Sequence, residues 1–355
     1  EIIQTELHEI GQRFGDARRT ELLIGEVLNL EDEDLIEEEE IVVTLTSNGY
    51  IKRVANTEFR AQRRGGRGVQ GMGVHDEDYV QTLISCSTHD TLLFFTNVGK
   101  VYRAKGYEIP EYGRTAKGIP VINLLGIDSN EQIQTIVSVN NEEISGNGYL
   151  FFTTRLGVVK RTSVTAFANI RSNGLIAIGL KDGDELVNVL KTTGEDVIII
   201  GTHNGYSVTF LEKAVRDMGR TAAGVRGVRL REEDYVIGAS IIRGEDEVLV
   251  ITENGYGKRT KGSEYPVKGR GGKGIKTANV TEKNGPLAGL TTVSGEEDLL
   301  LITNKGVMIR FHTADVSQTG RATLGVRLIK MEEDAKVVTM TTVEPEEVEE
   351  PTEQE

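Results

Sequence analysis

The segment TSNGYIKR, residues 46–53, is the first copy of a pattern that recurs along the chain. Related segments begin at Thr96, Thr154, Thr202, Thr252 and Thr303. Each places a glycine three positions after its threonine, and these glycines lie 50, 58, 48, 50 and 51 residues apart: Gly49, Gly99, Gly157, Gly205, Gly255 and Gly306. An apolar run precedes each segment, and glycine supplies the positive φ that a tight turn between strands requires. The pattern predicts six β-hairpins.

A second marker keeps phase with the hairpins. An arginine follows the hairpin glycine by 15 residues in five units and by 14 in the third, and a further glycine follows it: Arg64 and Gly68, Arg114 and Gly118, Arg171 and Gly174, Arg220 and Gly224, Arg270 and Gly274, Arg321 and Gly325. Each unit ends in an acidic turn and a last apolar strand. One four-stranded sheet cannot bury both of its faces without neighbours. We therefore predict an all-β fold in which six four-stranded antiparallel blades close a ring.

The net charge of −14 is unevenly distributed. Residues 1–40 hold 3 basic and 14 acidic side chains, and residues 343–355 hold 7 acidic and no basic ones. Residues 41–342 keep 38 basic side chains against 34 acidic ones, so the predicted ring is mildly basic. Acidic runs of this composition favour solvated chain. We expect a helix and acidic linker over 1–40, the ring over 41–342, and an acidic disordered tail over 343–355.

The opening segment differs from the repeats. Ile3, Leu7, Ile10 and Phe14 alternate four and three residues apart, which places them on one face of a short helix that Gly15 ends. Such a helix more often packs on a partner domain than stands alone. Because the first residue is Glu1, we expect the chain to begin inside a longer protein.

Several function classes lack support in the sequence. The single cysteine, Cys86, excludes an internal disulfide, and the five histidines show no metal-ligand spacing. No apolar run approaches the roughly 20 residues that span a bilayer, and no secretory signal opens the chain. We therefore expect a protein of the reducing cytoplasm, with no metal site and no catalytic residue in this segment.

Cations recur at fixed places in the units. The segment AQRRGGRGVQGM at 61–72 and the related GRGGKG at 269–274 combine arginine with glycine, which in isolation is also typical of a solvated flexible loop. The expected binding positions outside 61–72 are Lys52, Arg53, Arg103, Arg114, Lys117, Lys160, Arg161, Arg171, Arg220, Lys258, Arg259, Arg270, Lys273, Arg310 and Arg321. Arginine and close-approaching backbone grip phosphate. A rim of such charges fits duplex DNA, held through its backbone with weak sequence specificity.

At this point the sequence resembles a known family, the C-terminal domains of DNA gyrase A subunits. QRRGGRG at 62–68 is similar to the seven-residue box of that family, and ELHEIGQRFGDARRTEL near the start is similar to the last helix of the family's cleavage core. The resemblance implies a six-bladed β-pinwheel whose blades exchange strands and around whose rim DNA wraps with positive handedness. The box residues implied to clasp the DNA, on the loop where the first blade meets the last, are Gln62, Arg63, Arg64, Gly65, Gly66, Arg67 and Gly68.

The resemblance also implies partners. They are the cleavage core on the same chain and the gyrase B subunit, in a heterotetramer of two A and two B subunits on the bacterial chromosome. The catalytic tyrosine belongs to the cleavage core, and the holoenzyme's ATP and Mg²⁺ sites lie on other domains or subunits, so no cofactor is expected here. The alternatives are the C-terminal domain of the topoisomerase IV A subunit, whose box is degenerate, and a propeller that binds proteins through its loops.

Overall fold

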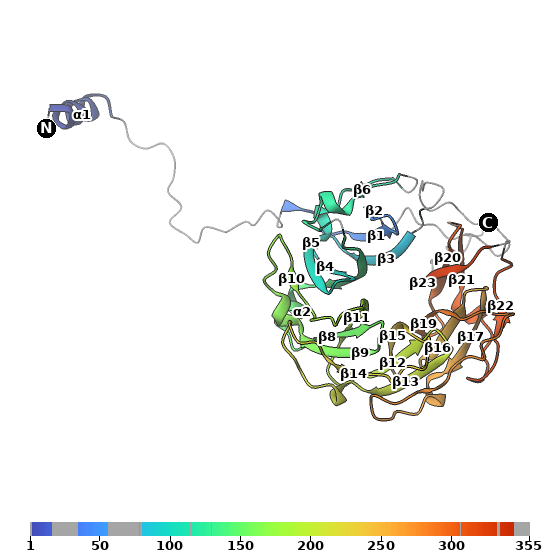
Figure 1. Ribbon diagram of the computed structural model, residues 1–355. Coiled ribbons are helices and arrows are strands. Elements are labelled where there is room, and N and C mark those ends of the chain that lie inside the picture. Colours follow the sequence, from blue (N-terminus) through green and yellow to red (C-terminus); the bar gives the residue numbers. More distant parts are fainter. Residues whose placement is uncertain are drawn as a thin grey trace, which may run out of the picture. The chain divides into compact units, whose positions relative to one another are not determined.

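The computed structural model describes residues 2–15, 35–55, 78, 80–113, 116–128, 130–305, 307–331 and 334–343. The chain divides into two compact units, residues 1–37 and 38–355 (Figure 1). The first unit contains α1 (Ile2–Phe14), which confirms the predicted helix. Its apolar side chains Ile2, Ile3, Leu7, Ile10 and Phe14 are 55–77% exposed. None of the helices that the structure describes is both long and apolar enough to cross a membrane.

The second unit is built of β-strands in six sheets, which we name blades A to F in chain order. Six hairpins form their middle strands: β1 (Glu40–Thr46) and β2 (Tyr50–Ala55), β4 (Thr91–Thr96) and β5 (Lys100–Lys105), β8 (Tyr149–Thr154) and β9 (Val158–Ser163), β12 (Val197–Thr202) and β13 (Tyr206–Leu211), β16 (Glu247–Thr252) and β17 (Tyr256–Lys261), β20 (Asp298–Thr303) and β21 (Met308–His312). The predicted hairpins are therefore confirmed.

The last strand of each unit lies on the inner side of its own blade. These inner strands are β3 (Val80–Ser87), β7 (Ile133–Val139), β11 (Leu186–Thr192), β15 (Val236–Ile242), β19 (Leu287–Val293) and β23 (Val337–Val343). Each contacts the next around the circle, and β23 contacts β3, so the six blades close a ring (Figure 1). A hydrogen bond of 3.4 Å from Thr339 Oγ1 to the Gln81 carbonyl joins β23 to β3.

A short strand exchanged between neighbours forms the outer edge of each of the first five blades. The exchanged strands are β6 (Ile119–Pro120), β10 (Leu175–Ile176), β14 (Val225–Arg226), β18 (Ile275–Lys276) and β22 (Val326–Arg327). The sheet orders, such as β3-β1-β2-β6 and β19-β16-β17-β22, show that each of them pairs with the preceding unit's hairpin. Within the described residues blade F has three strands, β21-β20-β23. The fold is thus a six-bladed propeller with exchanged strands.

Short helices connect the strands within this unit. They are α2 (Asn141–Ser145) and the 3₁₀ turns η3 (Gly106–Glu108), η4 (Val121–Asn123), η5 (Val164–Phe167), η6 (Glu212–Ala214), η7 (Gly262–Glu264) and η8 (Thr313–Asp315). Most of the 3₁₀ turns directly follow the second strand of a hairpin, where the chain leaves one blade toward the loop that carries the marker arginine.

The recurring threonine and glycine have separate tasks in the hairpin turns. Gly49 adopts a φ of 79° and Gly205 one of 83°, as the turns require. The threonine hydroxyl accepts a hydrogen bond from the backbone N–H four residues later, for example from Val158 to Thr154 Oγ1 at 3.0 Å. In blades C and D the same hydroxyl also donates to an acidic turn residue, as from Thr202 Oγ1 to Asp234 at 2.7 Å. The motif thus ties the hairpin to the start of the inner strand.

The hydrophobic core lies between blades. Phe95 of blade B stands edge-on to Phe152 of blade C, with ring centroids 5.5 Å apart, and both are fully buried. Because both faces of a blade contact neighbours, strands such as β4 and β16 are buried at every residue. Continuous apolar runs, rather than alternating ones, are the expected sequence for strands covered on both faces.

Candidate nucleic-acid interface

Three of the expected binding lysines are buried, which corrects their placement on the rim. Lys52 in β2 and Lys160 in β9 have no exposed surface, and Lys258 in β17 has 1%. They occupy the same register position in blades A, C and E. In each case the strand exchanged from the next unit covers the second strand of the hairpin. We name these three residues the buried lysines.

The ammonium groups of the buried lysines bind the loops that carry the marker arginines. Lys52 Nζ donates to the carbonyls of Gly113 and Ala116, at 3.1 and 2.9 Å. Lys160 Nζ donates to the carbonyls of Arg220, at 2.6 Å, and Gly219, at 3.2 Å. The buried lysines therefore hold the exchanged segments of the following units onto blades A and C.

Lys258 repeats this arrangement in blade E. Its Nζ donates to the Gly320 carbonyl at 2.7 Å and also to the Arg321 carbonyl. Burial lowers the pKa of Lys258 to about 8, and Arg321 adds to that decrease, whereas Glu264 opposes it. Burial, assisted by Arg220, lowers the pKa of Lys160 to about 7. Both shifts have the sign expected for a cation taken out of water.

The arginines beside the buried lysines are engaged inside the protein as well. Arg259 donates to Glu247 at 2.6 Å and to the Val316 carbonyl at 2.9 Å. Arg161 donates to the Gly194 carbonyl at 3.1 Å, and Arg53 forms a 3.5 Å ion pair with Glu111. Arg310 in blade F pairs with Asp298 at 2.7 Å. Of the hairpin cations that the sequence analysis named as binding positions, Arg103 alone is exposed, and it donates to the Ala168 carbonyl at 3.2 Å.

The marker arginines lie on the outer loops, at different depths. Arg171 and Arg270 are exposed, whereas Arg220 and Arg321 are half-buried. Arg270 donates to the carbonyls of Ala214 and Arg226, at 3.0 and 3.1 Å. Arg321 donates to the Lys276 carbonyl at 3.4 Å. These two arginines therefore join one exchanged strand to the next around the rim.

The remaining expected positions divide between described and undescribed residues. Lys117 lies over the ring of Tyr50 at 3.6 Å and is half-buried. Lys273 is exposed. Residues 62–68, which form the box, and Arg114 lie outside the described residues, so their roles stay predictions.

Sequence reasoning missed three exposed cations on the rim. Arg226, Lys276 and Arg327 are each the second residue of an exchanged strand, in β14, β18 and β22. All three are exposed. A signal was present, because each lies two residues after the marker glycine of its unit. The equivalent residues in β6 and β10 are Pro120 and Ile176.

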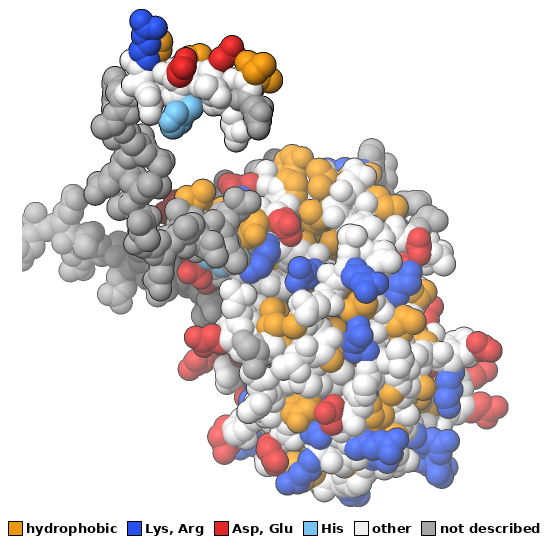
Figure 2. All heavy atoms as spheres, turned by 90° about the vertical axis from the view of Figure 1, so that its left-hand side faces the viewer, with side chains coloured by type: hydrophobic (Ala, Val, Ile, Leu, Met, Phe, Trp, Pro, Cys, Tyr) orange, Lys and Arg blue, Asp and Glu red, His pale blue; other side chains and the backbone are white. Residues whose placement is uncertain are grey.

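The two ends of the ring carry acidic side chains. On one end, the turns that leave the inner strands expose Glu142, Glu195, Glu245 and Glu296. On the other, the turns that precede the inner strands expose Asp182, Glu232, Glu233 and Glu282. Figure 2 views the rim edge-on, with Lys and Arg side chains along its middle and Asp and Glu mostly at its two margins. The same turns also expose Lys181, Arg243 and Lys283, so the two ends carry charges of both signs.

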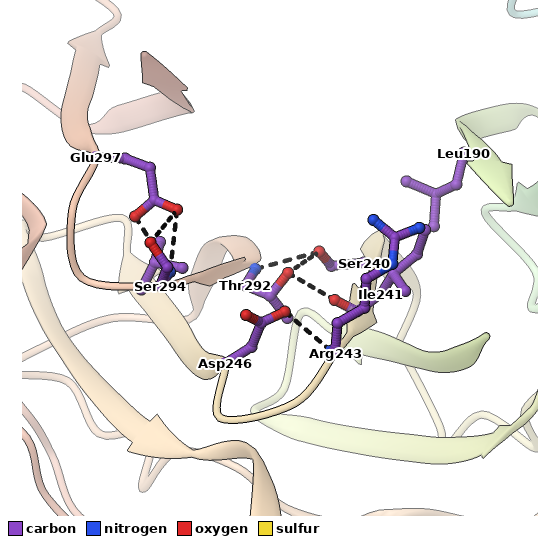
Figure 3. A pocket seen from close by; sticks show the side chains of 9 residues that line it. Leu190, Ser240, Ile241, Arg243, Asp246, Thr292, Ser294 and Glu297 are labelled. Carbon is purple, nitrogen blue, oxygen red and sulfur yellow. Dashed lines mark hydrogen bonds between the residues drawn. The ribbon is translucent and has the colours of Figure 1, made fainter. Parts of the chain in front are cut away.

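A cavity of about 280 Å³ lies among the ends of the inner strands β11, β15 and β19 (Figure 3). Its polar groups satisfy one another: Ser240 Oγ and Thr292 Oγ1 are 2.9 Å apart, and Asp246 accepts from the Arg243 N–H at 2.9 Å. Glu297 accepts from the Ser294 N–H at 3.0 Å. Across the described part of the chain, no group of three His, Cys, Asp or Glu side chains is placed to hold a metal ion.

The fold and its rim define a class: a β-propeller with exchanged outer strands and a basic edge. The family model described as "DNA gyrase C-terminal domain, beta-propeller" matches six segments, residues 40–87, 90–140, 148–193, 196–243, 246–294 and 297–344. The chain therefore belongs to the DNA gyrase C-terminal domain family.

Relatives and solved structures agree with this membership. The chain is 64% identical over 345 residues to the DNA gyrase A subunit of Streptococcus pyogenes serotype M1, a match that covers 97% of this chain and 42% of that protein. It is 62% identical over 343 residues to the DNA gyrase A subunit of Streptococcus pneumoniae serotype 4, with the same coverage. The chain thus spans about two fifths of the curated relatives it matches.

Two solved structures share the fold. A DNA gyrase A C-terminal domain superposes with a TM-score of 0.75 at 27% identity, covering 86% of this chain and 99% of the other. The C-terminal domain of a DNA topoisomerase IV gives a TM-score of 0.70 at 29% identity, with 87% and 94% covered. Structural similarity therefore does not separate the two enzymes.

Proposed function

We propose that this chain binds duplex DNA along the rim of the ring and bends it around the blades. The observation that carries the proposal is the series of exposed cations on the outer edge of the ring. Backbone phosphates fit such an edge, and counterion release makes their binding strong and sequence-independent. Among the described residues we assign this contact to Arg171, Arg270 and Lys273, together with Arg226, Lys276 and Arg327.

Bending requires several contacts in succession. Curving roughly 40 bp through half a circle costs on the order of 10 kcal/mol by smooth elastic estimates. A single patch would leave the DNA straight, whereas cations on successive blades hold it at each step. We propose that Arg63, Arg64 and Arg67 of the box hold the end of the bent duplex, because the box belongs to the first unit, whose strand β3 contacts β23 of blade F where the ring closes.

The ring contributes binding and wrapping to a larger enzyme in this proposal. Right-handed wrapping presents the duplex to the cleavage core so that strand passage yields negative supercoils, with ATP hydrolysis by the B subunit. The buried lysines do not belong to the DNA contact but position the loops that do. The likeness to the topoisomerase IV C-terminal domain supports a second candidate, a DNA-binding domain of that enzyme. The intact QRRGGRG sequence favours the gyrase role.

Bending is measurable with a duplex of about 40 bp that carries a fluorescence donor and acceptor at its ends. The 355-residue chain is expected to raise energy transfer as it binds, and added salt to reverse the rise. The box variant R63A/R64A/R67A is expected to bind with a smaller rise, because one end is released. Binding without any change in energy transfer for the unmodified chain would contradict wrapping.

A further inference from the structure

The dipeptide Asn-Gly occurs six times in the chain. It is the sequence in which asparagine most readily loses ammonia, because glycine has no side chain to hinder an attack of its nitrogen on the asparagine Cγ. The six asparagines are Asn48, Asn147, Asn173, Asn204, Asn254 and Asn284. In a folded chain the reaction also requires that the glycine nitrogen can move toward Cγ and release its proton.

Five of the six glycine nitrogens are held in tight turns. Each of these glycines has a φ between 72° and 83° and donates its N–H to a backbone carbonyl. The donors and their acceptors, at 2.8–3.0 Å, are Gly49 to Thr46, Gly174 to Arg171, Gly205 to Thr202, Gly255 to Thr252 and Gly285 to Thr281. A nitrogen bound in this way keeps its proton and its position, so the turn must open before the nitrogen can attack.

The sixth pair, Asn147 and Gly148, lies in the loop between α2 and β8 (Figure 1). Asn147 is exposed. Within the part of the chain that the structure describes, the Gly148 N–H has no hydrogen-bond acceptor, whereas the Gly148 carbonyl accepts from the Val164 N–H at 3.0 Å. Gly146 precedes the pair, so flexible residues flank Asn147 on both sides. The Gly148 nitrogen can therefore turn toward the asparagine side chain without breaking a hydrogen bond.

Exposure of the asparagine does not explain this difference. Asn48 and Asn173 are exposed like Asn147, yet their glycine nitrogens are bound. Asn48 also matches Asn147 in local sequence, because both are followed by glycine and then tyrosine. The two sites thus differ in the state of the glycine N–H and not in the chemistry of their neighbours.

We propose that Asn147 is a modification site, at which the folded chain deamidates spontaneously. The Gly148 nitrogen forms a bond to Cγ of Asn147, the bond from Cγ to Nδ2 breaks, and ammonia leaves with the proton of the Gly148 N–H. A water molecule then opens the cyclic imide at one of its two carbonyls, which yields aspartate or isoaspartate. The proposal is independent of DNA binding, since it depends only on the geometry of this loop.

The product changes the start of blade C. It adds a carboxylate after α2, where Glu142 is already exposed. The isoaspartate form also inserts one more carbon into the backbone, directly before the Gly148 carbonyl that binds the Val164 N–H. We therefore expect the isoaspartate form to hold the first strand of blade C less firmly than the unmodified chain does.

The test is incubation of the 355-residue chain in warm, mildly alkaline buffer made with oxygen-18 water, followed by digestion and mass spectrometry of the peptides. Water that opens the imide leaves oxygen-18 at the modified residue. The peptide that contains Asn147 is expected to take up the label at least about ten times faster than the peptides with Asn48 or Asn173, the ratio that one retained hydrogen bond gives. Uptake at Asn48 or Asn173 as fast as at Asn147, or no uptake at Asn147, would overturn the proposal.

Unfolded chain is the first control. In urea the turns are lost, so Asn48 and Asn147, which share their following residues, should take up the label at similar rates. If Asn147 is about ten times faster than Asn48 in urea as well, the difference lies in the sequence and the structural account is wrong.

Two variants separate the chemistry from its consequence. G148A is expected to slow the uptake at Asn147 several-fold and leave that at Asn48 unchanged. Its Cβ would lie 3.5 Å from Val164 Cγ2, an ordinary contact, so the variant should fold. N147D carries the added charge on a normal backbone. The incubated chain should therefore unfold at a lower temperature than N147D, and equal midpoints would show that the inserted carbon disturbs nothing.

Discussion

The Nζ of Lys258 lies 2.7 Å from the carbonyl oxygen of Gly320, a residue 62 positions later in the chain and in the next unit. This contact joins a hairpin of blade E to the loop that delivers the outer strand of the same blade. The same relation recurs for Lys52 in blade A and Lys160 in blade C. Alternate blades thus hold their exchanged strands with a buried ammonium group.

Replacing this ammonium should destabilise the ring. K258M keeps the length of the side chain and removes the lysine donor to the Arg321 carbonyl. The Gly320 carbonyl keeps the Thr323 Oγ1–H donor at 2.9 Å. The loss of the buried donor is expected to cost roughly 1–3 kcal/mol in the free energy of unfolding. Urea unfolding measures the loss. K261M, three residues away and exposed, is the control and should change the free energy by less than about 0.5 kcal/mol. Equal stability of K258M and the unmodified chain would show that the buried lysine holds nothing.

Stability should depend on pH through Lys160. Its pKa is lowered to about 7 in the folded chain, whereas an unfolded lysine titrates near ~10.4. Between these values the unfolded chain binds more protons, so the contribution of Lys160 to the free energy of unfolding rises with pH from about 7 to about 10. The measurement is the difference in unfolding free energy between the unmodified chain and K160M across this range. A constant difference would mean that the carbonyls of Gly219, Arg220 and Ala177, which all accept from Lys160 Nζ, keep the ammonium charged.

The marker glycine of the fourth unit should not tolerate a side chain. Gly224 has a φ of 90°, and a Cβ there would lie 2.5 Å from the Val159 carbonyl oxygen. We expect G224A to lower the free energy of unfolding by at least about 1 kcal/mol, from strain and displacement of β14. Gly219, in the same loop, has no atom within 4 Å of the position that a Cβ would take. G219A should therefore leave the free energy of unfolding nearly unchanged. Thermal unfolding of G224A and G219A measures both effects.

The acidic tail supplies a prediction about binding. Residues 344–355 lie outside the described residues and carry 7 acidic side chains. If the tail competes with DNA for the cationic rim, its deletion should tighten DNA binding at low salt and have little effect at high salt, because the competition is electrostatic. Anisotropy titrations of the chain with and without the tail decide this. Equal affinities at low salt would leave the tail a solubilising segment.

The hairpins and the ring were predictable because each rests on a local signal. Gly49 and Gly205 predict a positive φ in the hairpin turns. The apolar runs before them predict strands that are buried on both faces. The strand exchange was implied only by the family resemblance, since β14 and β18 are two residues long and no period or propensity marks so short an element.

The candidate interface was predictable only in part. The pair Lys160 and Arg161 looks like a surface charge in the sequence, but it lies on a second strand that the next unit's loop covers. Whether a cation faces solvent depends on that coverage, which is a contact between residues some 60 positions apart. Arg226 and Lys276 were not predicted. They belong to a second cationic register, two residues after the marker glycine, which the pattern of marker arginines does not include.

The measurement that tests the central claim most directly is a change in linking number. The 355-residue chain is bound to relaxed circular DNA, a nicking-closing enzyme equilibrates the complex, and the DNA is analysed after the protein is removed. Right-handed wrapping on the rim predicts an increase in linking number that grows with the amount of protein and is reduced in R63A/R64A/R67A. An unchanged or decreased linking number at saturating protein would contradict the account.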